Sequence, residues 1–327
     1  MGKMIYLDNA ATTKTAPEVV QAMLPYFSEF YGNPSSIYDF AGKSKEAVTK
    51  GREQIAEVLG AKKEEIYFTA GGSESDNWAL KATFEAYKSK GNHIITTKIE
   101  HHAILHTCEY LEKRGAKITY VDVDECNIDM LSSSGHKING PKGIGFLYIR
   151  KGVKIRSFVH GGAQERKRRA GTENVPGIVG YGVAAARANA SMKERTEKEI
   201  VIRDHLIQRI EAEIPYVKVN GDRVKRLPNN VNVSFQFVEG ESLLLMLDNY
   251  GICASSGSAC TSGSLDPSHV LLAIGLPHEI AHGSLRMTLS EETTMEDVDF
   301  VVDRLKEIVA HLRSMSPLYE DFMKKQK

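Results

Sequence analysis

The sequence has little of what secreted and membrane proteins use. Four cysteines in 327 residues are too few for a disulfide framework, which favours a reducing, cytoplasmic setting. No apolar run approaches the roughly 18 residues that cross a bilayer. Polar residues at positions 8 and 9 interrupt the N-terminus before a signal-peptide core could form. We therefore expect a cytoplasmic protein with no membrane partner.

Excess charge of either sign is also absent. Lys plus Arg and Asp plus Glu number 42 each, so no net field attracts nucleic acid. The one basic cluster, at 166–169, is either a solvated loop or a place for an anion such as a phosphate. The hydrophobic content of 42% and the length are sufficient for two domains with a large core.

Helical and strand patterns alternate along most of the chain, which predicts an α/β protein with a largely parallel sheet. Helices are expected from Pro17 (capped by Thr15), at 43–59 and from His101. Strands are expected at 65–69, 93–98, 117–123, 128–134 and 144–150. A long helical region from Pro176 is broken at Pro215. The shorter elements that follow, ending in a helix capped at position 294 with an acid at 297, indicate a smaller α+β domain joined by the N-terminal arm.

Two loops carry candidate chemistry. Gly71-Gly72-Ser73 stands where a strand turns into a helix, with a capping-box pattern at 73–76, and exposed N–H groups there favour a phosphate. A plain glycine turn with a serine cap is the alternative. Lys137 lies in SSSGHKINGPKGIG, where glycines and a proline could hold its amine rigidly for a Schiff base. The alternative is a surface lysine beside a β-turn.

The cysteines differ in their surroundings. Cys260 lies in SSGSACTSGS, a run of small residues typical of an exposed loop, where a thiolate could act as a nucleophile. Cys108 and Cys253 are expected to be small buried hydrophobes, and Cys126 is ambiguous.

Arg286, in HGSLRMTLS, could present its guanidinium to a carboxylate or form an exposed ion pair. His102 and His106 are one helical turn apart, but no further ligand stands at matching spacing, so a metal site is not expected. His101 is better interpreted as an aromatic surface for a planar ligand.

Eight motifs in order give the chain a family resemblance. They are YLDNAATT at 6–13, GNPSS at 32–36, FTAGGSESDN at 68–77, IEHHAIL at 99–105, SGHKINGPKGIG at 134–145, HGGAQERKRRAGTENVPGIVG at 160–180, SSGSACTSGS at 255–264 and HGSLR at 282–286. Together they resemble the NifS-like cysteine desulfurases, pyridoxal-phosphate enzymes of the aspartate-aminotransferase fold (fold type I).

The resemblance implies a large cofactor-binding domain at 16–211 with a mostly parallel sheet, and a small α+β domain from 1–15 and 212–327. It implies that Lys137 carries pyridoxal 5'-phosphate as an internal aldimine and then transfers protons, with His101 stacked on the ring. The implied phosphate ligands are Gly72, Ser73, Ser134, His136 and, from the other subunit of a homodimer, Thr172.

The implied substrate is L-cysteine, with its carboxylate held by Arg286 and Asn33. Cys260 would attack the sulfur, leaving an enzyme persulfide and releasing L-alanine. A sulfur-acceptor or scaffold protein would then take the sulfur for iron–sulfur cluster or thio-cofactor synthesis.

The chain is shorter than this family near Cys126. Only residues 124–127 separate two expected strands, whereas a crossover between parallel strands needs a dozen residues or more. The family carries there an aspartate for the pyridine nitrogen, and no Asp-x-x-Gln occurs anywhere in this chain. We therefore expect impaired desulfurase activity. The alternatives are a non-catalytic dimeric scaffold or sulfur-relay relative, and a selenocysteine lyase that uses the same residues.

Overall fold

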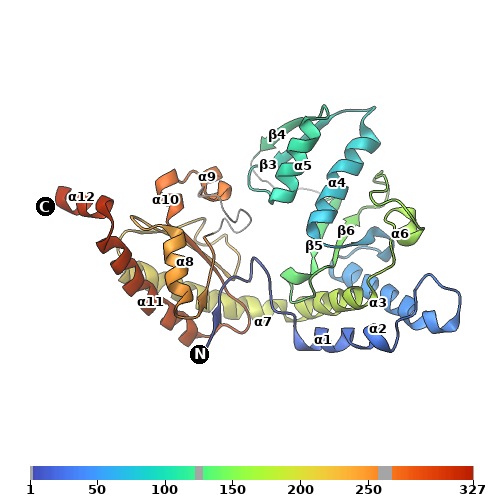
Figure 1. Cartoon of the computed structure of the whole chain (residues 1–327), viewed down its shortest axis with the longest axis horizontal. Coiled ribbons are helices and arrows are strands. Elements are labelled where there is room, and N and C mark those ends of the chain that lie inside the picture. Colours follow the sequence, from blue (N-terminus) through green and yellow to red (C-terminus); the bar gives the residue numbers. More distant parts are fainter. Residues whose placement is uncertain (1–2, 122–127, 257–266, 327) are drawn as a thin grey trace. The chain divides into compact units, whose positions relative to one another are not determined.

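The computed structural model describes residues 3–121, 128–256 and 267–326. These residues divide into two compact units: unit 1 comprises 1–12 with 192–327, and unit 2 comprises 13–191 (Figure 1). The domain boundaries expected from the sequence stay a prediction. No helix in the described ranges is long and apolar enough to cross a membrane.

Unit 2 contains most of the motifs. Its helices are α1 (Pro17–Met23), α2 (Pro25–Ser28), α3 (Gly42–Val58), α4 (Gly72–Tyr87), α5 (His102–Glu112), α6 (Gln164–Lys167) and the first part of α7 (Val175–Glu213), with short 3₁₀ turns η1 (Asp39–Ala41), η2 (Lys63–Glu65) and η3 (Gly135–Lys137). Its strands are β2 (Ile66–Thr69), β3 (His93–Thr97), β4 (Lys117–Val121), β5 (Met130–Ser134) and β6 (Gly145–Ile149). Every expected strand is present, with bounds a few residues shorter.

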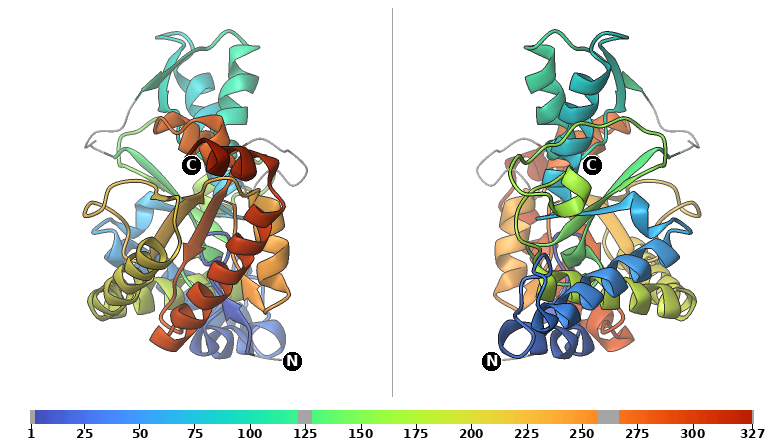
Figure 2. Two further views of the ribbon diagram at one scale, coloured as in Figure 1. Left: turned by 90° about the vertical axis from the view of Figure 1, so that its left-hand side faces the viewer. Right: turned by 90° about the vertical axis from the view of Figure 1, so that its right-hand side faces the viewer.

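The α/β class and the fold type expected from the sequence are confirmed. The strands of unit 2 form two separate sheets, β2-β6-β5 and β3-β4. β3 and β4 are parallel, with Ile94 beside Ile118. β6 runs antiparallel to both β2 and β5, which therefore point in the same direction. The views in Figures 1 and 2 show β3, β4 and α5 apart from β2, β6 and β5, with α4 leading from one group to the other.

The three-stranded sheet is covered on both faces because its side chains alternate. Phe68 and Phe146 pack with Ile55 of α3 and Tyr181 of α7 on one face. On the other face, neighbouring residues of β2 and β6 pack against Trp78 of α4. β2 is buried along its whole length as a result.

Unit 1 is built around a second core. Its strands are β1 (Ile5–Tyr6), β7 (Val217–Val219), β8 (Asn230–Phe235), β9 (Ile252–Cys253) and β10 (Ser284–Thr288), and its helices include the rest of α7, α8 (Gly240–Asp248), α9 (His269–Ala273), α10 (His278–His282), α11 (Met295–Ser314) and α12 (Pro317–Lys325). β10-β8-β7 is antiparallel, and β1 pairs with β9 in parallel. The predicted capping box at Thr294 and Asp297 is confirmed.

Two other predicted caps are wrong. Thr15 does not cap α1, which begins at Pro17 after Ala16; its hydroxyl donates to the carbonyl of Gly140 at 3.3 Å instead. Ser73 does not cap α4, whose N-cap residue is Gly71. In both cases the sequence pattern lies within a few residues of a real helix start, but another residue takes the cap position.

Candidate functional site

One cavity of unit 2, of about 680 Å³, brings together four of the residues singled out in the sequence. Gly72, His101, Ser134 and Lys137 line it, together with Asp76. This volume is within the range of small-molecule sites. A second cavity of about 610 Å³, beside Lys81 and Arg156, contains none of the predicted site residues.

The glycine turn before α4 lies directly on the sheet. A Cβ on Gly145 of β6 would come within 2.7 Å of the backbone of Gly71, so the two segments approach this closely only because residue 145 is a glycine. Ser75 anchors the first turn of α4, because its hydroxyl donates to the carbonyl of Phe146 at 3.0 Å and lies 2.8 Å from the Thr69 hydroxyl. The helix start, with its unpaired backbone N–H groups, is therefore held at one end of the cavity.

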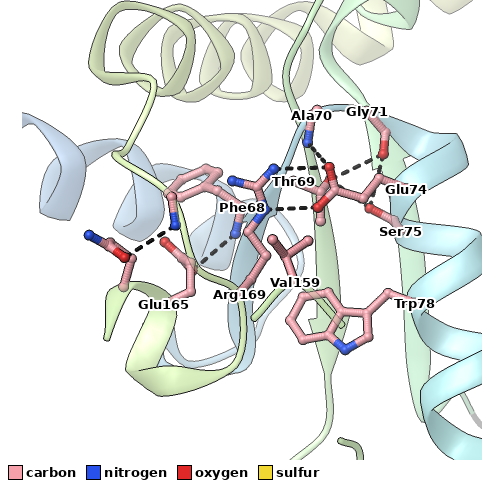
Figure 3. Close-up of polar contacts among 12 residues, drawn as sticks. Phe68, Thr69, Ala70, Gly71, Glu74, Ser75, Trp78, Val159, Glu165 and Arg169 are labelled. Carbon is pink, nitrogen blue, oxygen red and sulfur yellow. Dashed lines mark hydrogen bonds and ion pairs between the residues drawn. The ribbon is translucent and has the colours of Figure 1, made fainter. Parts of the chain in front are cut away.

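Glu74 connects this helix start to the basic cluster. Its carboxylate accepts hydrogen bonds from the Ala70 backbone at 2.8 Å and from Arg169, with Nε at 2.8 Å and Nη2 at 3.0 Å (Figure 3). Arg166 and Arg168 lie over the Tyr67 ring, at 4.0 and 5.1 Å from its centroid. Three of the four side chains at 166–169 thus have partners within unit 2. Of the two alternatives that the sequence allowed for this cluster, the solvated loop is therefore excluded.

A buried ion pair holds the same segment in place. Arg52 binds both carboxylate oxygens of Glu165, at 2.6 and 2.8 Å. Glu165 also accepts from the Phe68 backbone at 3.1 Å (Figure 3). Glu165, Arg166 and Lys167 all have positive φ, of 45°, 56° and 64°. Three successive residues in the left-handed region are costly, and packed partners of this kind are what maintain such a conformation.

The turn that carries Lys137 is fastened at its backbone. Thr13 donates from its backbone N–H and its hydroxyl to the His136 carbonyl, at 2.9 and 2.8 Å, and the same hydroxyl accepts from the Asn139 backbone at 2.8 Å. Asn139 has a positive φ of 62° and donates its amide to the carbonyl of Lys14 at 3.0 Å. The Lys137 side chain itself is exposed at the cavity.

Charge around this turn affects His136. Burial lowers the pKa of His136 from its ordinary value, and the nearby cations Lys137 and Lys142 lower that pKa further. A neutral imidazole is therefore favoured beside the lysine, where it can donate a hydrogen bond without adding charge.

β5 presents its serines to two sides. The Ser133 hydroxyl accepts from Tyr181 of α7 at 2.6 Å. Ser132 and Ser134 alternate with it and point toward α4: the Ser134 Cβ lies 3.6 Å from the position of a Cβ on Gly72, and the Ser132 hydroxyl binds the Asp76 carboxylate. The sequence reasoning identified Ser134 but missed Ser132 and Asp76.

His101 is the N-cap residue of α5, and its Nδ1 accepts from the Ala103 backbone at 3.1 Å. This bond fixes the ring at the cavity, where it is exposed. His102 and His106 stack on each other at 5.2 Å. Across the described ranges, no group of three or more His, Cys, Asp or Glu side chains could hold a metal ion.

The remaining predicted residues lie outside this cavity. Arg286, on β10 of unit 1, donates to the Asp8 carboxylate at 2.9 Å, and its Nε is buried with no acceptor among the described residues. Asn33 is exposed and accepts from the Ser35 backbone at 3.0 Å. Thr172 is exposed, six residues after Arg166. Cys260 and Cys126 fall outside the described residues. Cys108 is fully buried, as expected, but Cys253 is only half-buried, so that expectation is wrong.

Sequence reasoning missed five residues that organise the site: Thr13, Glu74, Asp76, Ser132 and Glu165. Asp76 had a visible signal, since it follows Gly72 by four residues and therefore shares its helix face. The pairs of Thr13 with the 136–139 turn and of Glu165 with Arg52 span more than 100 residues, and no local pattern announces them.

The residues around the cavity fit pyridoxal phosphate. The start of the 16-residue helix α4 offers backbone N–H groups and lies beside the Ser134 hydroxyl, a donor set suited to a phosphate. An amine, Lys137, lies on the same wall, and an imidazole, His101, offers a flat surface. The cavity therefore offers partners for the phosphate, the aldehyde and the ring face of a phosphorylated aromatic aldehyde.

Comparison with known proteins supports the same conclusion. The aminotransferase class-V family matches residues 5–125 and 119–301. A cysteine desulfurase IscS of Clostridium botulinum is 49% identical over 392 positions, covering 99% of both chains, and one from Methanosarcina thermophila is 48% identical, covering 97% of this chain and 94% of its own. A solved NifS-like protein superimposes with a TM-score of 0.87 at 31% identity, covering 94% of this chain and 100% of that one. Another, from Rickettsia africae, has a TM-score of 0.82 at 26% identity and covers 94% of this chain and 99% of its own.

The alignment also measures the shortened block. It spans 392 positions, 65 more than the 327 residues of this chain, so at least 65 positions have no residue here. The two stretches that match the family model overlap at 119–125. The shortening therefore lies after β4, near Cys126, where the sequence analysis expected it. Outside this block the chain follows its relatives almost from end to end. It belongs to the NifS/IscS cysteine desulfurases, pyridoxal-phosphate-dependent enzymes of the aminotransferase class-V family.

Proposed function

We propose that this chain removes sulfur from L-cysteine, releasing L-alanine and leaving the sulfur on Cys260 for transfer to an acceptor protein. The observation that carries the proposal is the cavity itself. It gathers an amine, Lys137, with a phosphate-type donor set at Gly72 and Ser134 and a flat ring at His101.

Within this proposal, Lys137 is the covalent anchor of the cofactor, and its Nζ moves the proton of the substrate α-carbon. When bound, pyridoxal phosphate supplies an electron sink that weakens the bonds at that carbon. Gly72, Ser73 and Ser134 hold the phosphate, and the neutral His136 adds a donor. His101 covers the ring and limits access of water.

Substrate binding is assigned to Arg286, with Asn33. The Arg286 guanidinium already binds one carboxylate, Asp8, through Nη2, and its Nε has no acceptor among the described residues. A guanidinium with an unused buried donor is suited to a carboxylate. Arg286 would then bind the cysteine carboxylate while Asp8 keeps its side chain in position.

The segment after Arg169 supports a dimeric enzyme. The ion pairs of Glu165 and Arg169 fix the chain just before Thr172, which is exposed. An exposed threonine on a firmly held segment is available to a neighbouring molecule, and we propose that Thr172 completes the phosphate site of a second copy. The acceptors are proposed to be sulfur-receiving or scaffold proteins of iron–sulfur cluster assembly in the cytoplasm.

The shortened block favours a second candidate. At least 65 aligned positions are absent after β4, and a chain without them could bind the cofactor and an acceptor yet turn over no substrate. This dimeric scaffold or sulfur-relay protein differs from the enzyme in one measurable respect, the formation of alanine.

The test uses the purified chain supplied with pyridoxal phosphate and then with L-cysteine. Visible absorption of bound cofactor is expected for the unaltered chain and for Lys142→Ala, an exposed lysine five residues away, but not for Lys137→Ala. Cys260→Ser is expected to keep the colour and to lose the protein-bound sulfur detected by mass spectrometry. Cofactor binding without any alanine would favour the scaffold. Selenocysteine consumed at least as fast as cysteine, with Cys260 dispensable, would instead indicate a lyase.

A further inference from the structure

The cavity contains a carboxylic acid that none of the roles above uses. Asp76 and Glu100 are the two acids among its described lining residues. Glu100 lies just before α5 and accepts from the Thr97 hydroxyl at 3.1 Å. Asp76 is on α4, half-buried, between the helix and β5.

Two neighbouring elements place Asp76 at a definite level of the cavity. Gly72 on α4 faces Ser134 on β5, and one helical turn later Asp76 faces Ser132, two residues away along the strand. One helical turn advances about 5.4 Å, and two strand residues about 6.6 Å. The phosphate-type donors and the Asp76 carboxylate are thus separated by a length similar to that of one pyridine ring with its methylene arm.

We propose that Asp76 is the acid that faces the pyridine nitrogen of the cofactor bound in this cavity. The inference rests on the proposed function, and it identifies the residue that takes this task in a chain shortened after β4. A pyridoxal-phosphate site needs an acidic or basic partner at the ring nitrogen to set the electronics of the ring. Asp76 supplies this group from a helix that is fully present.

The surroundings of Asp76 suit that task. Burial raises the pKa of Asp76, whereas the hydrogen bond from Ser132 and the positive potential of His101 lower it. A protonated ring nitrogen would stabilise this partly desolvated carboxylate, because opposite charges stabilise each other where solvent is partly excluded. Ser132 fixes the orientation of the carboxylate, and acts as a positioning residue.

The test compares two ligands and three proteins. The ligands are pyridoxal phosphate and its 1-deaza analogue, in which a C–H replaces the ring nitrogen. The proteins are the unaltered chain, Asp76→Asn and the control Glu85→Gln, an exposed acid on the same helix α4. Dissociation constants are measured by titration of visible absorption or by protein fluorescence, without substrate.

We expect Asp76→Asn to weaken pyridoxal phosphate binding about tenfold or more, as for loss of a hydrogen bond to a charged group, and to leave binding of the deaza analogue unchanged. Glu85→Gln should bind both ligands as the unaltered chain does. Asp76→Glu should restore part of the preference for the ring nitrogen.

Three outcomes overturn the inference and are distinguishable. Equal weakening of both ligands by Asp76→Asn would show that Asp76 acts through the fold alone, and the proposed function would stand. Unchanged binding of both would show that Asp76 has no part in holding the cofactor, and the proposed function would again stand. If the unaltered chain binds neither ligand, the proposed function fails together with the inference.

Discussion

At the scale of single residues, buried charge in unit 2 serves mainly to hold a strained segment. The Glu165 side chain is 3% exposed and that of Arg52 is 11% exposed. Ion pairs this deep gain little over apolar residues in general, but the loss of one partner leaves an unpaired buried charge. The three residues with positive φ at 165–167 depend on this pair.

Glu165→Gln is therefore expected to destabilise the protein by about 3 kcal/mol or more, because it leaves the Arg52 guanidinium buried without a counter-charge. The measurement is the free energy of unfolding from urea denaturation. Glu53→Gln, which removes an ion pair of Lys63 at exposed side chains, is the matched control and should cause no measurable loss. An equal effect of both would contradict the assignment.

His136 makes stability depend on pH. Its pKa in the folded state is lowered from 6.5 by burial and by Lys137 and Lys142, so on acidification the unfolded chain takes up the proton first. The contribution of His136 is then full above pH 6.5 and is lost as the pH falls below it. His136→Asn lacks this titration, so its unfolding free energy should fall less between pH 7 and pH 5 than that of the unaltered chain. Parallel curves for the two proteins would exclude the effect.

At the scale of elements, the helix start and the lysine turn are positioned by close backbone contact. A Cβ on Gly145 would lie 2.6 Å from the Ser133 carbonyl and 2.7 Å from Gly71. Because the neighbours are backbone atoms on both sides, no rotamer change can relieve the contact.

We expect Gly145→Ala to cost about 1–3 kcal/mol of stability, as for overpacking of a core, and to weaken cofactor binding by moving the Gly71-Gly72 turn. Gly42→Ala, at the start of α3 with open space around it, is the control and should be neutral or slightly stabilising in thermal unfolding. Unaltered cofactor affinity in Gly145→Ala would show that the turn tolerates displacement.

The elements themselves could be predicted from the sequence where the hydrophobic period is strong. The helix at 43–59 and the strands at 65–69 and 144–150 match α3, β2 and β6 within two residues. Cap residues were less predictable. Thr15 and Ser73 both fit the sequence pattern of an N-cap, but the conformation of the neighbouring backbone determines which residue takes that position.

The site was predictable only as a set of motifs. Lys137, Ser134, Gly72 and His101 were identified, and the cavity brings them together. The contacts that hold them, such as Thr13 with His136 and Glu74 with Arg169, join residues 123 and 95 positions apart. Spacing along the chain carries no signal of such pairs, and only the folded backbone shows them.

At the scale of the whole molecule, the block absent after β4 is the main difference from the relatives. Insertion of the corresponding positions of the Clostridium botulinum protein between Val121 and Ile128 should raise the turnover of L-cysteine. We expect at least a tenfold gain, about 1.4 kcal/mol of activation free energy. The reason is that the inserted block would bring a further acid to the pyridine nitrogen, which Asp76 otherwise faces alone. The measurement is alanine formed per bound cofactor, and equal rates would show that the shortened chain is already complete as a catalyst.

The division of unit 2 into two sheets also affects how this unit opens. Among the described residues β3 and β4 pair only with each other, and all of their residues are half-buried or exposed, whereas β2 is buried throughout. Local opening of the β3–β4 pair then costs less free energy than opening of β2 and β6. Backbone amides of β3 and β4 should therefore exchange with deuterium well before those of β2. The side of the cavity formed by α5 would then open locally while the side that carries Lys137 stays folded.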